Sequence, residues 1–268
     1  MQLENKKSMS NLTFAKENLP MTVKVNCNLR STIEKQKYVT ASAAQWELST
    51  NAQESFATLQ KSWNNLEPDK YYGELHSSNY RVRRYSDFYY VPNTGEFRPC
   101  NHVSYYQSKR QNSYAGGQHR HFGDIVPEVY ENKFFRSLVE YDFKQFPIPE
   151  IYLDRNWICQ VHMIRIVVGS NQTTPTTPEG IHSDGYPFAG VHLINRKNIT
   201  GGESRVYSAD SEQLASLTFE QPLDSLWFED RLMKHYVTPI SNNEDSEAHR
   251  DILAISFSLP DSPYTTDV

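Results

Sequence analysis

The fold is decided by WICQVHMIRIVVG at 157–169 and by RDILAISFSL at 250–259. Both runs are apolar, contain many β-branched side chains and are bounded by Gly, Pro, Asn or Asp, which is typical of strands. Four shorter runs of the same character lie between them: YPFAGVHLIN (186–195), ESRVYSA (203–209), SLWFED (225–230) and HYVTPI (235–240). Short strands at this spacing predict an all-β sandwich or barrel, with its main strands at about 150–260.

Two segments upstream have a helical period instead. Aromatic residues recur at helical spacing in SAAQWELSTNAQESFATLQKSWNNL at 42–66, while PEVYENKFFRSLVEYDFKQFP at 127–147 begins and ends with proline. Between them, 71–97 alternates aromatic residues with arginines and ends in a Pro-Asn-Thr-Gly turn, which predicts a strand hairpin. Helices followed by strands predict an α+β class, with a helical brace at about 41–149 against one face of the sheet.

Composition excludes several classes of protein. The chain has 268 residues, with 27 Lys and Arg against 32 Asp and Glu, so its net charge of −5 argues against nucleic-acid binding. No apolar run is long enough for a membrane span, and the first 20 residues lack the apolar core of a secretory signal, which predicts a cytoplasmic location. We expect a poorly ordered arm at 1–40 and one domain at 41–268.

A metal site is predicted by His182-Ser183-Asp184, which lies just before the apolar run at 186–195. Residues two apart in an extended backbone point to the same side, so an imidazole and a carboxylate can converge on one cation. His235 lies 51 residues after Asp184 in another predicted strand and can provide a third ligand. Two histidines and one carboxylate that leave other positions open are typical of non-haem Fe(II) oxygenases.

A second His-x-Asp pair, His249-Arg250-Asp251, has no histidine in the 17 residues that follow it, so it is the weaker metal candidate. Arg250 itself is more informative. It alternates with Ile252 and Ala254 on one face of a predicted strand, where its guanidinium can bind a carboxylate with two hydrogen bonds. The simpler alternative is an ion pair with Asp251 or Glu247.

Several motifs together resemble a known family. IHSDGYPFAGVHLIN (181–195), NITGGESRVYS (198–208), DRLMKHYVTPI (230–240) and HRDILAISFS (249–258) occur in the order seen in iron(II)/2-oxoglutarate-dependent dioxygenases of the bacterial free amino-acid hydroxylase family, of which L-isoleucine hydroxylase is the type. Upstream, YYGELHSSNYRVRRYSDFYY (71–90) and HMIRI (162–166) are similar to two weaker motifs of the same family. The resemblance covers about residues 70–260.

This resemblance implies a double-stranded β-helix, the jelly-roll core of the cupins, braced by the N-terminal helices. It implies Fe(II) held by His182, Asp184 and His235, 2-oxoglutarate and O2 as cosubstrates, and Arg250 on the distal carboxylate of 2-oxoglutarate. The expected reaction hydroxylates an unactivated C–H bond of a free L-amino acid or close derivative and releases succinate and CO2. Related halogenases replace the carboxylate ligand by a small residue, so the presence of Asp184 favours hydroxylation.

Substrate-binding residues are predicted from the charges of an amino acid. Arg83, Arg84 or Arg165 can bind its carboxylate, and Glu203, which follows a Gly-Gly turn, can face its ammonium group. His192 lies in an apolar strand and is expected to border the metal and its cosubstrate.

Three alternatives stay open from the residues alone. A zinc or manganese cupin that acts as a hydrolase or isomerase would not need Arg250. A cupin-like binding or sensor protein would keep the scaffold with a degenerate site. The dioxygenase chemistry can also serve a peptide side chain or a larger metabolite, which an exposed groove would favour over a closed pocket.

Overall fold

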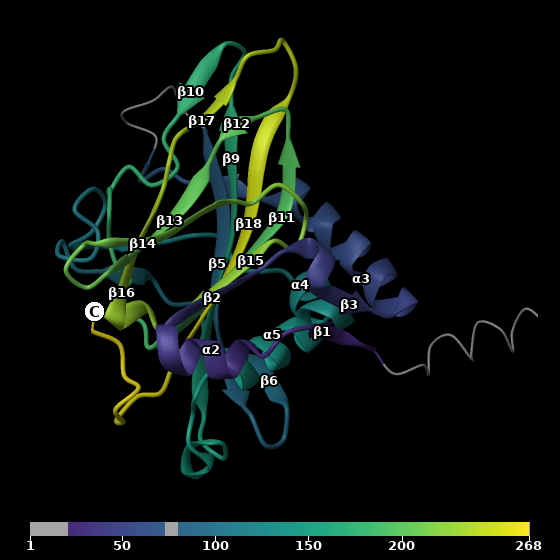
Figure 1. Cartoon of the computed structure of the whole chain (residues 1–268), viewed down its shortest axis with the longest axis vertical. Helices are drawn as coiled ribbons and strands as arrows, with labels where there is room; N and C mark the ends of the chain where they lie inside the picture. The colour runs from purple at the N-terminus through teal and green to yellow at the C-terminus, as the bar shows by residue number, and fades with distance from the viewer. Residues whose placement is uncertain (1–20, 73–79, 268) are drawn as a thin grey trace, which may run out of the picture.

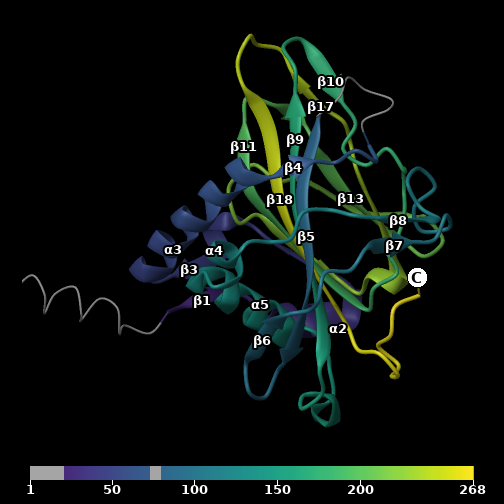
Figure 2. The ribbon, with the colours of Figure 1, turned by 180° about the vertical axis from the view of Figure 1, so that it is seen from behind.

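An eight-stranded antiparallel sheet forms the centre of the protein (Figures 1 and 2). The structure is a computed structural model, and it describes residues 21–72 and 80–267. The strand order is β2 (Tyr38–Ala41), β15 (Ser225–Phe228), β11 (Phe188–Lys197), β18 (Ala248–Ser258), β9 (Trp157–Val168), β5 (Arg81–Val91) and β4 (Glu67–Pro68), with β6 (Glu96–Pro99) paired to β5. The predicted C-terminal strands are confirmed.

Two smaller three-stranded sheets lie along one side of the large sheet (Figure 1). One has the order β14 (Gln213–Thr218), β13 (Glu203–Ser208) and β16 (Met233–Val237), and the other has the order β10 (Gln172–Thr174), β17 (Ile240–Asn242) and β12 (Thr200–Gly201). Two-stranded pairs are formed by β1 (Val23–Val25) with β3 (Trp46–Leu48) and by β7 (Tyr105–Gln107) with β8 (Gln118–Arg120).

The helices cover the opposite side of the large sheet. They are α2 (Leu29–Gln36), α3 (Thr50–Gln60), α4 (Pro127–Tyr130) and α5 (Lys133–Gln145), with short 3-10 turns η1 (Ala43–Gln45), η2 (Lys61–Asn65), η3 (Glu150–Tyr152) and η4 (Asp230–Leu232). Leu253, Ile255 and Phe257 of β18 belong to the apolar cluster that contains the buried side chains of α5. Because side chains alternate along a strand, the intervening residues of β18 face the smaller sheets. The α+β prediction is therefore confirmed in its sheet and its helical brace.

The boundaries within the N-terminal part differ from the prediction. Residues 1–20 of the expected arm lie outside the described residues, but 21–41 are ordered secondary structure that includes β1, α2 and β2. Strand β2 pairs with β15 at the edge of the large sheet, and Leu29 and Ile33 of α2 are fully buried. The prediction of a poorly ordered arm is wrong for 21–40, because burial of these few apolar residues compensates for a polar composition.

The helical brace is also shorter than predicted. The helix expected at 42–66 contains a 3-10 turn and the strand β3 before α3 begins, so Trp46 lies in a strand. The helix expected at 127–147 is divided into α4 and α5 at Asn132, whose side chain accepts a hydrogen bond from the Phe135 amide as an N-cap. The predicted hairpin within 71–97 is present as β5 and β6, apart from residues 73–79, which lie outside the described part. Strand β5 belongs to the large sheet rather than to a helical region.

A buried polar network joins α5 to the large sheet. The Asp142 carboxylate of α5 contacts His192 Nε2 of β11 at 2.8 Å and accepts a hydrogen bond of 2.7 Å from Trp227 Nε1 of β15. His192 Nδ1 contacts Ser225 Oγ at 2.9 Å. All four side chains are fully buried, so each polar atom depends on these partners rather than on water.

Asp142→Ala is therefore expected to lower the free energy of unfolding by about 3–5 kcal/mol, because it leaves polar atoms of His192 and Trp227 buried without their partner. Urea unfolding measures this loss. Asp142→Asn keeps the shape and one hydrogen-bond acceptor, so it should cost clearly less. An equal cost for both variants, or less than about 1 kcal/mol for alanine, would contradict a structural role for the network.

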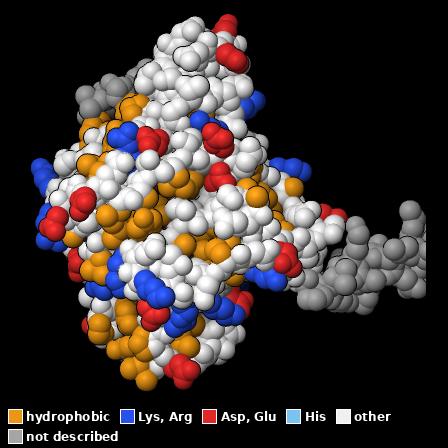
Figure 3. Space-filling view, viewed as in Figure 1, with side chains coloured by type: hydrophobic (Ala, Val, Ile, Leu, Met, Phe, Trp, Pro, Cys, Tyr) orange, Lys and Arg blue, Asp and Glu red, His pale blue; other side chains and the backbone are white. Residues whose placement is uncertain are grey.

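The surface gives a mixed pattern of charge. Figure 3 shows acidic and basic side chains interspersed, with small hydrophobic areas among them, on the face viewed in Figure 1. Within 21–72 and 80–267, none of the helices combines the length and the apolar character needed to cross a bilayer.

Candidate metal centre and substrate cavity

A cavity lies between the large sheet and the smaller sheets. Its walls come from the alternating residues of β5, β9, β11 and β18 that point away from the helices, and from β13 and β16 on the other side. On β18 these residues are Arg250, Ile252, Ala254 and Ser256. The predicted alternation of Arg250 with these neighbours is confirmed.

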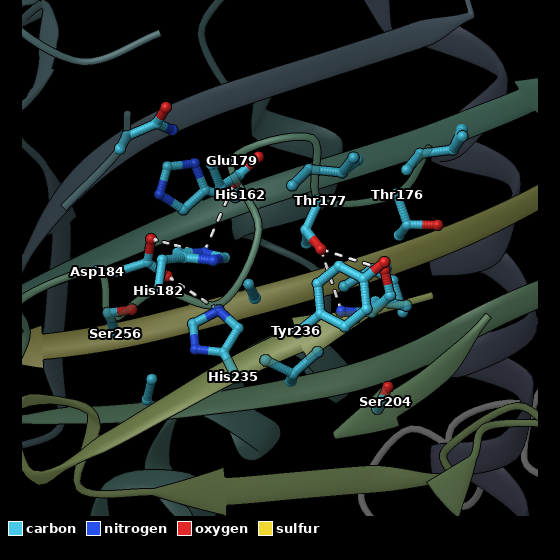
Figure 4. A pocket seen from close by; sticks show the side chains of 18 of the residues that line it. His162, Thr176, Thr177, Glu179, His182, Asp184, Ser204, His235, Tyr236 and Ser256 are labelled. Atoms are coloured by element: carbon cyan, nitrogen blue, oxygen red, sulfur yellow. Dashed lines mark hydrogen bonds and ion pairs between the residues drawn. The ribbon is translucent and has the colours of Figure 1, made fainter. Parts of the chain in front are cut away.

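His182, Asp184 and His235 meet at one end of this cavity, where they point toward one another (Figure 4). Each offers a ligand atom, and these atoms lie within 4.8 Å of one another. The Nε2 atoms of His182 and His235 are both 3.7 Å from the Asp184 carboxylate. These three side chains are therefore in position to hold one metal ion from one side, and imidazole and carboxylate donors suit iron.

Backbone pairing holds the two histidines together. His182 precedes β11 in a loop, yet its amide donates to the His235 carbonyl at 3.1 Å, and the His235 amide donates to the His182 carbonyl at 2.8 Å. His182 Nδ1 contacts the Gly180 carbonyl at 2.9 Å, which leaves Nε2 directed at Asp184. Such a contact fixes both the ring orientation and the nitrogen that is free to bind a metal.

Asp184 is held by partners behind the site. Gln107 Nε2 donates to Asp184 Oδ1 at 2.7 Å. The buried Asp230 carboxylate accepts from the Asp184 amide at 3.2 Å and from the Tyr186 amide at 2.9 Å. It also lies 3.6 Å from Nδ1 of His235. Asp230 thus connects both sides of the three-residue cluster, as outer carboxylates do in metal centres.

The electrostatics favour metal-binding protonation states at two of the three residues. Burial and the neighbouring His182 lower the pKa of His235 to about 3, so its imidazole is neutral at physiological pH. Burial opposes ionisation of Asp184, but His182 and His235 outweigh it, and the pKa of Asp184 is lowered. Neutral imidazole and ionised carboxylate are the forms that bind a metal ion. Burial and the Asp184 charge raise the pKa of Asp230 to about 7.

Arg250 lines the same cavity and is 4% exposed. Its Nε is buried without a hydrogen-bond partner in the described part of the chain. Asp251, which faces the other side of the sheet, is already bound by Arg165 at 2.7 and 2.8 Å. Burial, together with Arg196 nearby, lowers the pKa of Arg250 to about 9, which leaves it charged at neutral pH. Because Asp251 faces the other side of the sheet and is bound there by Arg165, the alternative of an ion pair between Arg250 and Asp251 is excluded.

Three more buried arginines, Arg81, Arg83 and Arg120, line the cavity. Arg81 and Arg83 each lie 3.5 Å from one oxygen of Asp69. Arg120 is bound instead by neutral groups, with hydrogen bonds of 2.5 Å to Gln107 Oε1 and 3.4 Å to the Tyr72 hydroxyl. Among the described residues, one carboxylate thus pairs with two of these three guanidinium groups and Arg120 has only neutral partners, so this wall of the cavity suits an anionic ligand.

Glu179 provides the opposite charge close to the three-residue cluster. Its Oε1 is 3.6 Å from His182 Nε2, and its Oε2 is buried without a hydrogen-bond partner among the described residues. Figure 4 shows Glu179 beside His182, with His162 next to it. Burial and the nearby arginines keep the pKa of His162 well below its usual range, so His162 is neutral and contacts the Arg83 guanidinium.

The structure separates the remaining predicted site residues into two groups. Arg83, predicted as a candidate for binding the substrate carboxylate, lines the cavity. His192 does not, because Ala189 and Val191 line the cavity and His192 points to the helices, where it binds Asp142. The prediction that His192 borders the metal is therefore wrong. His192 does lie in an apolar strand, but its face of that strand packs against the helices.

Arg165 and Glu203 are corrected for similar reasons. Ile164 and Ile166 line the cavity, so Arg165 between them points to the helix side and binds Asp251. Glu203 lies outside the cavity lining and pairs with Arg205 at 2.8 Å. Arg84 alternates with Arg83 and binds the Asn65 and Asp124 carbonyls on the other face.

Sequence reasoning missed Gln107, Arg120, Glu179 and Asp230. Glu179 precedes His182 by three residues in a Pro-Glu-Gly segment, and Asp230 lies two residues after the apolar strand β15. A search for acidic residues close to the metal motif or just after an apolar strand would have found both. Gln107 and Arg120 lie in short strands within a polar stretch, where no local pattern marks them.

Comparisons with known proteins agree with this geometry. The sequence model of the family described as 2OG-Fe dioxygenase matches residues 60–256. A curated protein from Bacillus thuringiensis, L-isoleucine-4-hydroxylase, is 28% identical over 200 residues, which are 74% of this chain and 80% of that protein.

Solved structures give the same picture of the fold. A BsmA homologue from Methylobium petroleophilum PM1 has a TM-score of 0.73 at 26% identity, covering 91% of this chain and 95% of its own. IDO from Bacillus thuringiensis has a TM-score of 0.71 at 23% identity, covering 87% of this chain and 98% of its own. The Fe(II)/α-ketoglutarate-dependent dioxygenase TqaL reaches 0.63 at 17% identity, covering 89% and 90%.

Proposed function

Because the chain belongs to the 2OG-Fe dioxygenase family, whose members use Fe(II), 2-oxoglutarate and O2, we propose that it hydroxylates the side chain of a free L-amino acid at the centre formed by His182, Asp184 and His235. The observation that carries this proposal is that buried charges of both signs lie beside the cluster. Arg83 and Arg120 are cationic and Glu179 is anionic, and each has a buried side-chain atom without a hydrogen-bond partner among the described residues. The name of the Bacillus thuringiensis relative, L-isoleucine-4-hydroxylase, supports the same substrate class.

The metal is assigned to the three side chains because their donor atoms fit it. When bound, iron with 2-oxoglutarate and O2 supplies the oxidising chemistry, in which the cosubstrate yields succinate and CO2 and one oxygen atom enters a C–H bond. The protein provides geometry: the Gly180 carbonyl orients His182, and Gln107 and Asp230 hold Asp184. The scaffold we propose is the double-stranded β-helix of this family, with the large sheet and the smaller sheets as its two sides.

Arg250 is proposed to bind the distal carboxylate of 2-oxoglutarate. Its buried Nε has no partner within the described residues, and a dicarboxylate would supply one. Apolar side chains of the same cavity, such as Val191, Ile252 and Ala254, can contact the two methylene groups of the cosubstrate and exclude water from it.

An α-amino acid would be recognised by its two charges. We assign its carboxylate to the wall that contains Arg83 and Arg120, and its ammonium group to Glu179. Arg83 and Arg120 are 3% and 1% exposed, so the ligand they bind must enter an enclosed space, which favours a small molecule over a peptide. The carbon held closest to the iron would then determine the position of hydroxylation.

This function is tested with a panel of L-amino acids in the presence of Fe(II), 2-oxoglutarate and O2. We expect one or a few of them to stimulate succinate formation, with an equal amount of product 16 mass units heavier. Stimulation by peptides but by no free amino acid would reject the substrate class and leave the dioxygenase assignment intact.

Glu179→Gln is expected to raise KM for the amino acid about 30-fold, because removing one partner of a buried charge pair costs about 2 kcal/mol or more. The dissociation constants of Fe(II) and 2-oxoglutarate should change little. Steady-state kinetics and calorimetric titration measure these quantities.

Glu203→Gln is the matched control for that variant, because it makes the same substitution at a residue outside the cavity lining. Its KM should stay within about twofold of the unmodified enzyme. Equal effects of the two substitutions, or no effect of Glu179→Gln, would contradict the assignment of the ammonium site.

A further inference from the structure

Arg196 is the side chain whose place in the sheet the function above does not explain. Strand β11 pairs with β18, and the register places Arg196 directly opposite Arg250. Directly opposed residues of antiparallel strands lie on the same face of the sheet, and like charges in that position are destabilising. A pair of arginines here therefore needs a compensating interaction.

A β-bulge produces this pairing. Leu193 pairs with Ile252 and Asn195 pairs with Asp251, so the register shifts at Ile194. Leu193 packs in the apolar cluster on the cavity side, and strict alternation from it would turn Arg196 toward the helices. The extra residue reverses the alternation and directs Arg196 to the side of Arg250. Bulges next to active sites re-aim side chains in this way.

The contacts of Gly202 confirm that the two guanidinium-bearing side chains approach one another. A Cβ added to Gly202 would lie 3.3 Å from Arg196 Nη1 and 3.7 Å from Arg250 Cδ. Gly202 has a φ of +73°, which favours glycine, and its small size leaves room for both side chains.

Neither arginine forms an ion pair with a carboxylate of the described residues. Arg196 Nη2 donates to the Ile199 carbonyl at 3.2 Å and to the Gly201 carbonyl at 3.0 Å, but Nη1 is buried without a hydrogen-bond partner in the described chain. Arg250 Nε is likewise buried without a hydrogen-bond partner among the described residues. Within 21–72 and 80–267, no ion pair involves either residue. The charge of Glu220 acts on Arg196 from a distance, but burial outweighs it and the pKa of Arg196 is lowered. Two adjacent cations without an ion-paired carboxylate form a site that favours a negatively charged group.

We propose that Arg196 is a positioning residue of the cosubstrate site. Its positive charge adds to that of Arg250 in attracting the distal carboxylate, and the two charges make this end of the cavity specific for a 2-oxo acid that has such a carboxylate. This inference rests on the proposed role of Arg250. Arg196 lies outside the cavity lining, so it acts through its charge and through the placement of Arg250 rather than by contact with the reacting atoms.

The test measures binding, not turnover. Dissociation constants are determined by calorimetry without oxygen, with Mn(II) in place of iron, for 2-oxoglutarate and for 2-oxopentanoate. The second ligand has the same chain with a methyl group in place of the distal carboxylate. Arg196→Gln should weaken 2-oxoglutarate binding about tenfold, as expected for one charge removed near a partly buried anion, and should leave 2-oxopentanoate binding within about twofold.

Two further variants control this comparison. Arg196→Lys keeps the charge and should recover most of the affinity for 2-oxoglutarate. Lys197→Gln removes the same charge from the next residue of β11, where the exposed Lys197 pairs with Glu247 at 2.8 Å, and should change neither constant. Thermal unfolding of each variant verifies that it is folded.

The outcomes separate the inference from the function on which it rests. An unchanged affinity of Arg196→Gln for 2-oxoglutarate would overturn the inference, and so would equal weakening of both ligands, which indicates a purely structural role in bracing Ile199 and Gly201. If Arg250→Gln also leaves 2-oxoglutarate binding unchanged, the cosubstrate site itself is misplaced. If Arg250→Gln weakens that binding and Arg196→Gln does not, only the role of Arg196 fails.

Discussion

Asp184→Ala is expected to lose more than about 100-fold in Fe(II) affinity and, with it, succinate formation that depends on an amino acid. The physical reason is that Asp184 supplies the only anionic donor in the cluster found among the described residues. Loss of an outer partner of a metal ligand already costs about 10–100-fold in affinity, so loss of a ligand should cost more. Metal affinity is measured by equilibrium dialysis without oxygen, and succinate by mass spectrometry.

The same variant should remain folded without metal. The substitution removes a partly buried negative charge, and Gln107 is the side chain that loses a hydrogen bond. A matched control is Asp210→Ala, which changes an exposed residue of the turn between β13 and β14 and should keep both iron binding and activity. A folded Asp184→Ala protein with unaltered Fe(II) affinity would show that the metal lies elsewhere.

Arg250→Gln is expected to raise the dissociation constant of 2-oxoglutarate by about 100-fold or more while the affinity for Fe(II) is retained. Truncation of one partner of a buried, hydrogen-bonded charge pair costs about 2–5 kcal/mol, and each 1.4 kcal/mol is about tenfold in a dissociation constant. The Gln side chain is shorter and uncharged, so the distal carboxylate would be buried without a cation. Calorimetric titration of the metal-loaded protein measures the change.

Lys197→Gln serves as the control for this variant too, because it removes an equal charge from the neighbouring strand β11 at an exposed position. Arg250→Gln should also lose its preference for 2-oxoglutarate over 2-oxopentanoate. If the variant still discriminates between these two acids as the unmodified protein does, Arg250 does not bind the distal carboxylate.

Local sequence patterns were sufficient for the strands with a regular alternation. In β18 the period of two holds without interruption, and it correctly placed Arg250 on the same face as Ile252 and Ala254. The order of the motifs likewise indicated the family and the three residues that meet at the cavity. These features depend on neighbours in the sequence or on a pattern shared by relatives.

Features that depend on distant contacts could not be predicted. In the sequence of β11, the face that carries His192 looks as apolar as the face that lines the cavity. Only the packing of α5 shows that the His192 face is the helix side. The bulge at Ile194, which turns Arg196 toward Arg250, leaves no local signal. Strand β2 is polar in part, and it forms because the edge of β15 offers it backbone partners.

The arginine wall of the cavity, proposed above to bind the substrate carboxylate, was missed for the same reason. Arg120 comes from β8, and it meets Gln107 of β7 and Tyr72 only in the folded chain. A polar segment between two helical regions gives no indication that its arginine is almost completely buried. Of the three arginines selected from the sequence, Arg83 lines the cavity, whereas Arg84 and Arg165 lie on the other face of the sheet.

The proposed binding of iron and 2-oxoglutarate at this centre is tested most directly by titrating the metal-free protein with both in the absence of oxygen while its visible absorption is recorded. Chelation of iron by the 2-oxo acid at this centre predicts a weak charge-transfer band that saturates at one iron per chain, is lost in Asp184→Ala, and needs a much higher 2-oxoglutarate concentration in Arg250→Gln. The absence of such a band from the folded, unmodified protein, or an unchanged band in Asp184→Ala, would contradict it.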